Sequence, residues 1–267
     1  MSNSHNNNLT FWEHIDVLRK MIFRSLAVVV LFAGLAFVYK DFLFSVVLAP
    51  SKSDFVTYKI ICRLGQKLAL DMCPENFVVQ LINTQLSSQF LIHLSISFYA
   101  GVIVALPYLV YQLFQFVAPA LYKNERKYSG WVILFSLLLF LTGVLLNYFI
   151  IFPISFRFLS TYQIDPSVPN MINLSSYMDT LTMLSLMIGL MTELPIFAWF
   201  LAKIGVLSDT FMRKYRRHVV VVLMIIAAII TPTADVFTLL LVFVPLYLLY
   251  ELSIVVVRRV GKKKNFE

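Results

Sequence analysis

Long runs of apolar residues alternate with short charged segments along most of this 267-residue chain. Six runs are predicted to be membrane-spanning helices, at about 21–39, 88–115, 129–153, 177–201, 218–232 and 236–257. An α-helix rises about 1.5 Å per residue, so about 20 apolar residues cross a hydrocarbon core about 30 Å thick. The pattern predicts an all-α integral membrane protein with six transmembrane helices. We expect a single polytopic membrane domain over residues 1–267, in which the polar, Asn-rich residues 1–10 form a disordered tail.

The fifth run is shorter than an ordinary span. Its apolar core, Val219 to Ile230, would be about 18 Å long as a helix. A buried helix of a soluble protein has that length, but a short span can also be accommodated by local thinning of the bilayer. A basic cluster precedes this run and a TPTAD turn follows it, which fits a short membrane helix pair at least as well. In the sixth run, Pro245 predicts a kink.

Composition supports the membrane assignment. Hydrophobic residues make up 60% of the chain and charged residues 13%, whereas soluble domains average about 45–50% and about 25%. The net charge of +8 does not indicate nucleic-acid binding, because the cations lie in short clusters between apolar runs. The first apolar run is predicted to be a retained span rather than a cleaved signal, since the nearest candidate cleavage site would place Pro50 at or beside the new N-terminus.

Lysine and arginine are distributed unevenly between the two sides of the predicted topology. One side carries sixteen, in the N-terminal segment, the loops after the second and fourth spans, and the tail. The other side carries six, of which five belong to one long loop where the positive-inside rule is weak. Both termini are therefore predicted to be cytoplasmic, in agreement with an even number of spans. Glu251 is expected near Arg258 and Arg259 on that side.

The two cysteines, Cys62 and Cys73, both fall in the first external loop. In an oxidising compartment they could pair and close a ten-residue loop. Two free thiols are the alternative, and the sequence alone does not choose between them.

Motifs of the common enzyme classes are absent from the chain. There is no GxSxG, HExxH, P-loop or GxGxxG motif, and the four histidines lack the spacing of metal ligands. We therefore predict that the protein is not an enzyme and that it uses no metal, nucleotide or other cofactor.

Glu193 is the most informative polar residue inside a predicted span. It lies ten residues before Lys203, about 15 Å along a helix and hence near the middle of the bilayer. An ionised side chain there is costly unless it is paired or hydrated, and Pro195 removes a helical hydrogen bond close by. These features favour a functional, water-lined cavity over a protonated glutamate that bonds a neighbouring helix. Asn147 is interpreted as an interhelical contact.

The stretch FVAPALYKNERK, Phe116 to Lys127, converts an apolar run into a charged loop. Pro119 predicts that the helix bends or ends here, and Tyr122 suits a membrane–water boundary. Glu125 is the one carboxylate among the cations of this loop. Taken alone it is either solvated or faces a cationic partner.

Two predicted external turns contain further candidates. Asp235 either caps the sixth helix, since Asp is favoured at a helix start, or has a functional role. Pro50 is interpreted as a plain turn residue.

Four segments together resemble the TatC family, the multispanning receptor subunits of the twin-arginine protein translocase. They are HIDVLRK at 14–20, PYLVYQLFQFVAPALYKNERK at 107–127, FIIFPISFRFL at 149–159, and TELPIF with ITPTADVF at 192–197 and 230–237. The resemblance implies six helices in a curved, glove-like wall with short fifth and sixth spans, in the bacterial cytoplasmic (inner) membrane. It implies binding of twin-arginine signal peptides of folded precursors, transport driven by the protonmotive force, and single-span partner subunits of the TatA/TatB type in an oligomeric complex.

The resemblance also implies site residues. Glu125, Phe116 and Arg19 match the signal-peptide site, and two adjacent guanidiniums are well bound by carboxylates. The family usually reads HLxELR where this chain reads HIDVLR, so Val17 replaces the usual glutamate, and Asp16 or Glu13 is expected to take its place. The remaining matches concern transport, structure or partner docking: Glu193, Asp235, Pro50, Tyr148 and, for docking, Thr231. The turn TPTAD is one residue longer than the family's TPPD.

A proton-coupled secondary transporter that uses Glu193 at the midplane is the alternative function. A scaffold protein of the membrane is a third. Neither gives a role to Glu125 in its basic loop, and the chain shows no internal inverted repeat.

Overall fold

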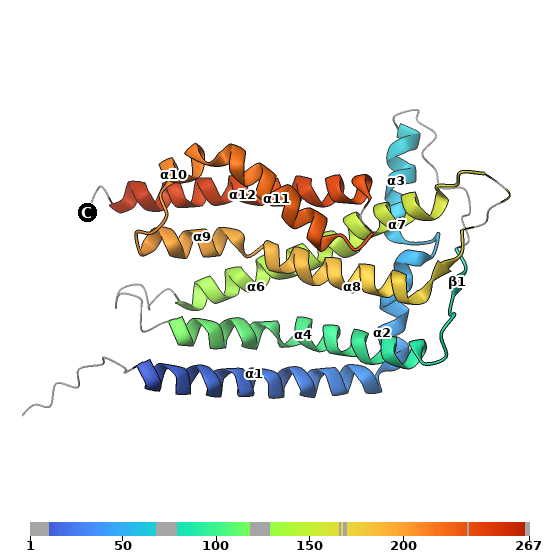
Figure 1. Ribbon diagram of the computed structural model, residues 1–267, viewed down its shortest axis with the longest axis horizontal. Helices are drawn as coiled ribbons and strands as arrows, with labels where there is room; N and C mark the ends of the chain where they lie inside the picture. The colour runs from blue at the N-terminus through green and yellow to red at the C-terminus, as the bar shows by residue number, and fades with distance from the viewer. Residues whose placement is uncertain are drawn as a thin grey trace, which may run out of the picture.

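The computed structural model describes residues 11–67, 79–117, 129–165, 167, 170–233 and 235–264. Its long helices lie roughly antiparallel, and most of the short elements gather at one end (Figure 1). The elements that form the apolar stretches are α1 (Phe11–Val38), α4 (Ser88–Val117), α6 (Ser129–Leu146), the π-helix η3 (Asn147–Ile151), α7 (Phe152–Thr161), α8 (Leu174–Met191), α9 (Leu194–Lys203), α11 (Arg216–Ile230) and α12 (Val236–Lys264). The short helix α10 (Asp209–Lys214) precedes α11. The predicted disordered tail, residues 1–10, lies outside the described residues.

Five helical stretches are long and apolar enough to cross a membrane. They are Ile15–Val38, Ser88–Leu113, Gly130–Thr161, Leu174–Lys203 and Val236–Gly261. Each coincides with a run predicted from the sequence, which confirms a largely helical chain with several candidate spans. The remaining predicted span corresponds to α11, which has only 15 residues. A sixth span therefore stays a prediction.

The helix that contains the sixth predicted span is longer than the predicted range 236–257. α12 has 29 residues and contains a 26-residue candidate span. The helix continues through Pro245. Proline is tolerated inside membrane helices because neighbouring groups can satisfy the freed backbone carbonyl, so it does not end the element.

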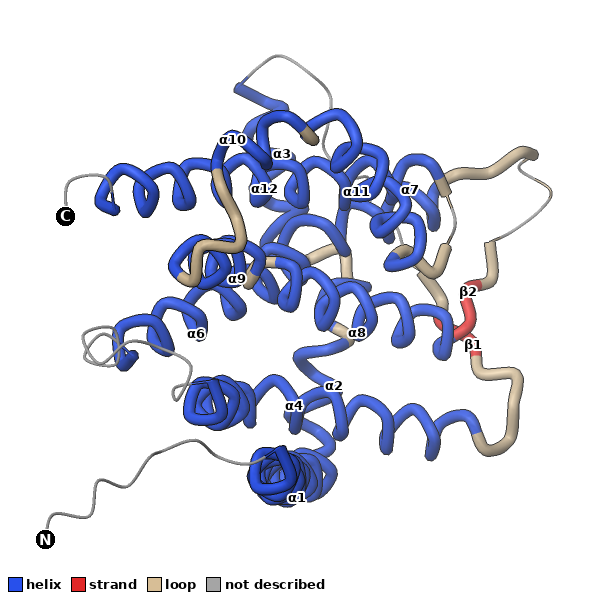
Figure 2. The backbone as a smooth tube through the Cα atoms, turned by 60° about the vertical axis from the view of Figure 1, so that its left-hand side comes forward, coloured by secondary structure: helices blue, strands red, loops and turns tan. Residues whose placement is uncertain are grey.

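The helices pack in an order that largely follows the chain. The main contacts join α1 to α4, α4 to α6, α6 to α8, α9 to α12, and α11 to α12 (Figure 2). The arrangement runs from α1 at one edge to α11 and α12 at the other. It makes a wall of helices whose two edges are formed by different parts of the chain.

The two ends of the wall differ in content. One end, here called the terminal end, carries the start of α1 and the ends of α4, α9 and α12 (Figure 1). The other, the cap end, carries α2 (Lys40–Val47), the 3₁₀-helix η1 (Ala49–Ser51), α3 (Val56–Lys67) and two strands, β1 (Leu81–Ile82) and β2 (Ile172–Asn173). The strands pair in parallel, with Leu81 opposite Ile172. This pairing is a small correction to the all-α prediction, because two-residue strands leave no periodic signal in the sequence.

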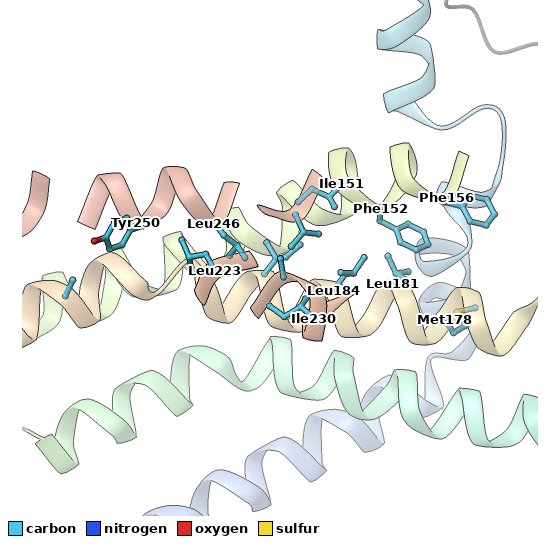
Figure 3. Close-up of a cluster of buried hydrophobic side chains, with 14 of the residues drawn as sticks. Ile151, Phe152, Phe156, Met178, Leu181, Leu184, Leu223, Ile230, Leu246 and Tyr250 are labelled. Atoms are coloured by element: carbon cyan, nitrogen blue, oxygen red, sulfur yellow. The ribbon is translucent and has the colours of Figure 1, made fainter. Parts of the chain in front are cut away.

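The buried core lies where α7, α8, α11 and α12 meet (Figure 3). Leu184, Leu246 and Val242 are completely buried there, and Phe152 and Phe156 fill the part nearer the cap end. By contrast, α1 has one buried apolar residue among its described side chains, Val29. The position of α1 therefore depends mainly on its contact with α4.

Gly101 sets how closely α1 and α4 approach. A Cβ at this position would lie 2.6 Å from the backbone nitrogen of Ala33 and 2.8 Å from its Cα. Because backbone atoms cannot move aside as a flexible side chain can, any larger residue must push the two helices apart. Small residues at membrane helix interfaces commonly permit such close contact.

We expect Gly101→Ala to destabilise the α1–α4 contact. Overpacking a tight contact costs about 1–3 kcal/mol, so the midpoint of thermal unfolding in detergent should fall. Gly34→Ala is the matched control, since a Cβ at Gly34 in α1 meets nothing within 4 Å. Equal melting temperatures of the two variants would contradict this role of Gly101.

Candidate functional site

The predicted signal-peptide residues fall at the terminal end, on α1 and α4. Asp16 and Arg19 are exposed near the start of α1, and Phe116 is half-buried in the last turn of α4. Figure 1 shows these two helix ends at the same end of the molecule. The structure thus places the α1 and α4 parts of the predicted site on neighbouring helices.

The acids predicted for this site differ in whether the structure describes them. Glu125 lies outside the described residues, and Glu13 lies in α1 at a position whose side chain is not described. Val17, which occupies the usual glutamate position, is 43% exposed. Asp16 is therefore the exposed carboxylate that the described part of α1 offers beside this position.

Arg19 contacts an aromatic ring, and among the described residues it forms no ion pair with an acid. Its guanidinium lies 5.8 Å from the ring centroid of Phe23, one turn further along α1. Such a cation–π contact is worth about 0.5–1 kcal/mol at an exposed site. It leaves the guanidinium on the outer surface of α1.

Glu193 is buried where the fourth apolar stretch changes from α8 to α9. The helix breaks at Thr192 and Glu193, and Pro195 follows in the first turn of α9. Glu193 is 7% exposed, and its Oε2 accepts a hydrogen bond from the Ser136 hydroxyl of α6 at 2.7 Å. The buried carboxylate and the helix break therefore coincide, and the bond from Ser136 on α6 is the contact with a neighbouring helix that the alternative interpretation expected.

The second carboxylate oxygen of Glu193 is not satisfied. Oε1 is buried and has no hydrogen-bond partner among the described residues. Next to it, Thr192 packs tightly on α6, where a Cβ at Gly143 would lie 2.6 Å from the Thr192 methyl group. A buried polar group without a partner costs free energy, so this oxygen is available to a water molecule or another donor.

Asn147 forms the interhelical contact predicted from the sequence. Its Nδ2 donates to the Ser185 hydroxyl of α8 at 2.8 Å, and the side chain is completely buried. It begins the π-helix η3, so the local irregularity of the third stretch lies at this polar contact. The interpretation of Asn147 as an interhelical contact is confirmed.

Asp235 caps α12. Its Oδ1 accepts from the Thr238 backbone N–H at 2.6 Å, and its Oδ2 accepts from the Thr233 hydroxyl at 2.7 Å. Burial alone would raise the pKa of this carboxyl, but the bonds from Thr238 and Thr233 outweigh burial and the pKa is lowered. Of the two alternatives, the geometry demonstrates capping.

We expect Asp235→Ala to cost about 1 kcal/mol of stability, as other lost N-caps do. Because the native pKa is lowered, this stabilisation is fully present above the ordinary Asp pKa of about 3.9 and is lost as pH falls through the native pKa. Thermal unfolding of the wild type and the variant at several pH values would measure it. Asp235→Asn should retain most of the cap; a loss as large as that of the alanine variant would contradict the capping role.

Pro50 and Tyr148 take part in the contacts that join α2 and η1 at the cap end to the third apolar stretch. Pro50 is buried in η1, and its carbonyl accepts from the Tyr58 hydroxyl at 3.0 Å; the same hydroxyl lies 3.1 Å from the Pro153 carbonyl. The Tyr148 hydroxyl donates to the Val46 carbonyl at 2.7 Å. Pro50 therefore does more than form a turn, because it is part of the contact between η1 and α7.

Tyr58 and Tyr177 belong to this contact and were not anticipated from the sequence. Tyr58 is completely buried, and Tyr177 donates from its hydroxyl to the Val47 carbonyl at 2.9 Å. Burial raises the pKa of the Tyr58 phenol well above its ordinary value, despite the opposing effect of Arg157. Tyrosines in loops and at helix starts carry no pattern that announces such long-range bonds.

Two further residues are placed by the structure. Thr231 is buried at the end of α11 and donates to the Ala227 carbonyl at 3.0 Å, so its hydroxyl is used within its own helix. Cys62, in α3, is disulfide-bonded. Cys73 lies outside the described residues.

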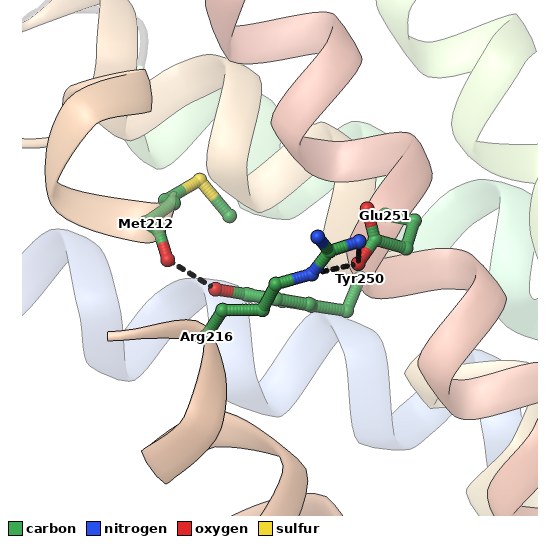
Figure 4. Close-up of polar contacts among 4 residues, drawn as sticks. All are labelled: Met212, Arg216, Tyr250 and Glu251. Carbon is green, nitrogen blue, oxygen red and sulfur yellow. Dashed lines mark hydrogen bonds and ion pairs between the residues drawn. The ribbon is translucent and has the colours of Figure 1, made fainter. Parts of the chain in front are cut away.

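Glu251 forms an ion pair that was not anticipated from the sequence. It pairs with Arg216 at the start of α11, whose Nε donates to Oε1 at 2.6 Å (Figure 4). Beside it, the Tyr250 hydroxyl donates to the Met212 carbonyl of α10 at 2.8 Å. The pair forms because α11 and α12 make a helical hairpin, which brings the start of α11 alongside Glu251.

Comparison with known proteins gives a consistent result. The sequence model of the family "Sec-independent protein translocase protein (TatC)" matches residues 13–245. The TatC protein of Blattabacterium sp. subsp. Periplaneta americana is 36% identical over 264 residues, covering 97% of this chain and 98% of that protein. The TatC protein of Deinococcus radiodurans is 33% identical over 247 residues, covering 92% and 85%.

The fold matches as well. A crystal structure described as the twin arginine translocase receptor TatC superposes with a TM-score of 0.75 at 29% sequence identity, covering 93% of this chain and all of that chain. Together with the membrane-spanning stretches and the buried glutamate, these matches lead to one conclusion. The chain belongs to the TatC family of Sec-independent protein translocase proteins.

Proposed function

We propose that this chain binds the twin-arginine signal peptides of folded precursor proteins at its terminal end. The TatC family is a translocase component and not an enzyme family, so the function to be explained is recognition and transport. The observation that carries the proposal is the placement of exposed Asp16 and half-buried Phe116 on adjoining helices at one end. The solved relative is itself described as a receptor.

The chemistry of the terminal end suits two adjacent guanidiniums. Arginine binds carboxylates through two parallel hydrogen bonds, which give both strength and defined geometry. Glu125 in the loop after α4 and Asp16 or Glu13 on α1 supply the carboxylates in this proposal. Phe116 supplies an aromatic surface on which the apolar part of a signal peptide can pack.

The proposal extends to the wider assembly. The terminal end lies in the cytoplasm of a bacterial cell, both chain ends face it, and the protein resides in the cytoplasmic membrane. Single-span partners of the TatA/TatB type dock along α11 near Thr231, where the apolar side chains of Ile225 and Ile229 are exposed. Transport then uses the protonmotive force, without nucleotide.

The proton-coupled transporter loses support from the family assignment. A buried carboxylate beside a helix defect suits either function, but the match covers nearly the whole chain of several TatC proteins. In this proposal Glu193 serves precursor transport by the translocase.

A photo-crosslinking side chain in place of Phe116 tests the proposed binding surface. We expect it to crosslink to a twin-arginine signal peptide, because the position lies at the end of α4 beside the start of α1. A crosslinker in place of Phe42, an exposed aromatic residue of α2 at the cap end, is the matched control. Equal crosslinking at both positions, or at neither, would contradict the assignment of the site to the terminal end.

A further inference from the structure

The helix α3 has an exposed face that the translocase function does not use. It lies across the axes of the long helices at the cap end and extends away from α7 (Figure 1). Its inner face is buried, since Tyr58 is 0% and Thr57 8% exposed. A helix that lies across the direction of membrane spans runs along the membrane surface rather than through the bilayer.

The outer face of α3 is both apolar and basic. Val56, Lys59, Ile60 and Arg63 are spaced as i, i+3, i+4 and i+7, which places them on one side of the helix. Val56 is 54% and Ile60 51% exposed, and both cations are exposed as well. Apolar residues flanked by cations are the pattern of a helix that lies in a membrane interface.

Charge in this part of the chain is one-sided. The segment Ala49–Lys67 contains four lysines or arginines and one acid. That acid, Asp54, is paired with Lys59 at 2.9 Å, and both side chains are mostly exposed. An exposed pair of this kind is worth little, so Lys59 can exchange its partner.

Contacts with the third stretch fix the position of α3 along that helix, whose candidate span is Gly130–Thr161. The Thr57 hydroxyl donates to the Phe149 carbonyl of η3, and the Phe55 ring stacks on the Phe149 ring at 5.7 Å. Phe149 follows Gly130, the start of that candidate span, by 19 residues. This corresponds to about 29 Å of helix, close to the thickness of the hydrocarbon core.

Aromatic residues also mark this level. Phe55, Tyr148 and Phe149 form one cluster, with ring centroids 4.9 to 5.7 Å apart. Such rings are enriched where hydrocarbon meets the headgroups. Phe149 and Ile150 remain 38% and 50% exposed beneath α3, as expected for side chains in contact with lipid.

We propose that the outer face of α3 binds the anionic headgroups of phospholipids in the adjacent leaflet. Val56 and Ile60 enter the interface, while Lys59 and Arg63, with Lys52 from the preceding turn, contact the lipid phosphates. Long basic side chains can lay their apolar stems on lipid and keep the charge at the headgroups. The contact anchors the cap, and it is independent of signal-peptide binding at the opposite end.

The test uses the full chain reconstituted in phosphatidylcholine nanodiscs. Ile60→Trp adds a fluorescent reporter on α3 to the three native tryptophans, whose signal is subtracted with the wild-type protein. Brominated phosphatidylglycerol or brominated phosphatidylcholine is then added at equal fractions. We expect phosphatidylglycerol to quench the reporter more strongly, because only that headgroup carries net negative charge.

Matched variants separate headgroup binding from simple contact with lipid. Val30→Trp, on the exposed face of α1 in mid-span, should be quenched equally by the two lipids. Adding Arg63→Gln or Lys52→Gln to Ile60→Trp should each lower the apparent phosphatidylglycerol affinity about fivefold, as expected for one cation near an anionic surface. Val56→Trp repeats the measurement in case Ile60→Trp disturbs folding.

Two results would overturn the proposal. Equal quenching of the α3 reporters by both lipids would show contact without recognition of charge. Absence of quenching by either lipid would show that this face points into water, where a protein partner would be the occupant instead.

Discussion

Replacement of Glu125 by alanine is expected to abolish export of a twin-arginine reporter while the protein remains in the membrane. In the proposed site this carboxylate binds a signal-peptide guanidinium. Removing one partner of a charge pair costs about 2–5 kcal/mol, which corresponds to a loss of affinity of about 30-fold or more. Reporter export measured with equal amounts of membrane-inserted protein would show the effect.

The choice of peptide makes this experiment specific. Wild-type protein should bind a twin-arginine peptide more tightly than a twin-lysine peptide, because lysine cannot form the bidentate contact. Glu125→Ala should lose most of that discrimination. Asp54→Asn is the matched control, since it removes an exposed acid at the cap end and should leave export unchanged. Normal export by Glu125→Ala would exclude the proposed recognition role.

Asp16 and Glu13 can be separated in the same assay. The structure shows Asp16 exposed on α1, next to Val17 at the usual acid position. Asp16→Asn and Glu13→Gln each keep the shape of the side chain and remove only its charge. The variant with the larger loss of twin-arginine discrimination identifies the acid that has replaced the family glutamate.

Replacement of Glu193 by alanine is expected to impair export or precursor insertion. The change removes a buried carboxylate from the α8–α9 break and leaves the Ser136 hydroxyl without its acceptor. An ionisable residue at mid-membrane depth is a strong functional candidate because burying it is unfavourable. Export of a reporter and the extent of signal-peptide insertion are the measurements.

Two companion variants separate function from structure at this position. Glu193→Gln preserves volume and can still accept the bond from Ser136, so a purely structural role would be restored by it. A need for an ionisable group would leave Glu193→Gln as impaired as Glu193→Ala. Ser136→Ala removes one hydrogen bond worth about 1 kcal/mol and should have a smaller effect. Normal export by Glu193→Ala would return Glu193 to a structural role.

Much of the architecture was determined by the sequence alone. In a membrane every backbone polar group must be satisfied locally, so a long apolar run has to be helical. For this reason the five candidate spans coincide with predicted runs. The helix defect near Glu193 and the bond from Asn147 to a neighbouring helix were also predictable, since a proline or a polar side chain inside an apolar run has few other solutions.

The tertiary structure alone decided which distant groups meet. Tyr58 and Tyr177 bind backbone carbonyls 8 to 130 positions away, Glu251 pairs with Arg216, and β1 pairs with β2. Each depends on how two helices or loops approach, which local hydropathy does not encode. The same holds for Asp235, where the TPTAD turn allowed two roles and the folded backbone placed the Thr238 N–H against its carboxylate.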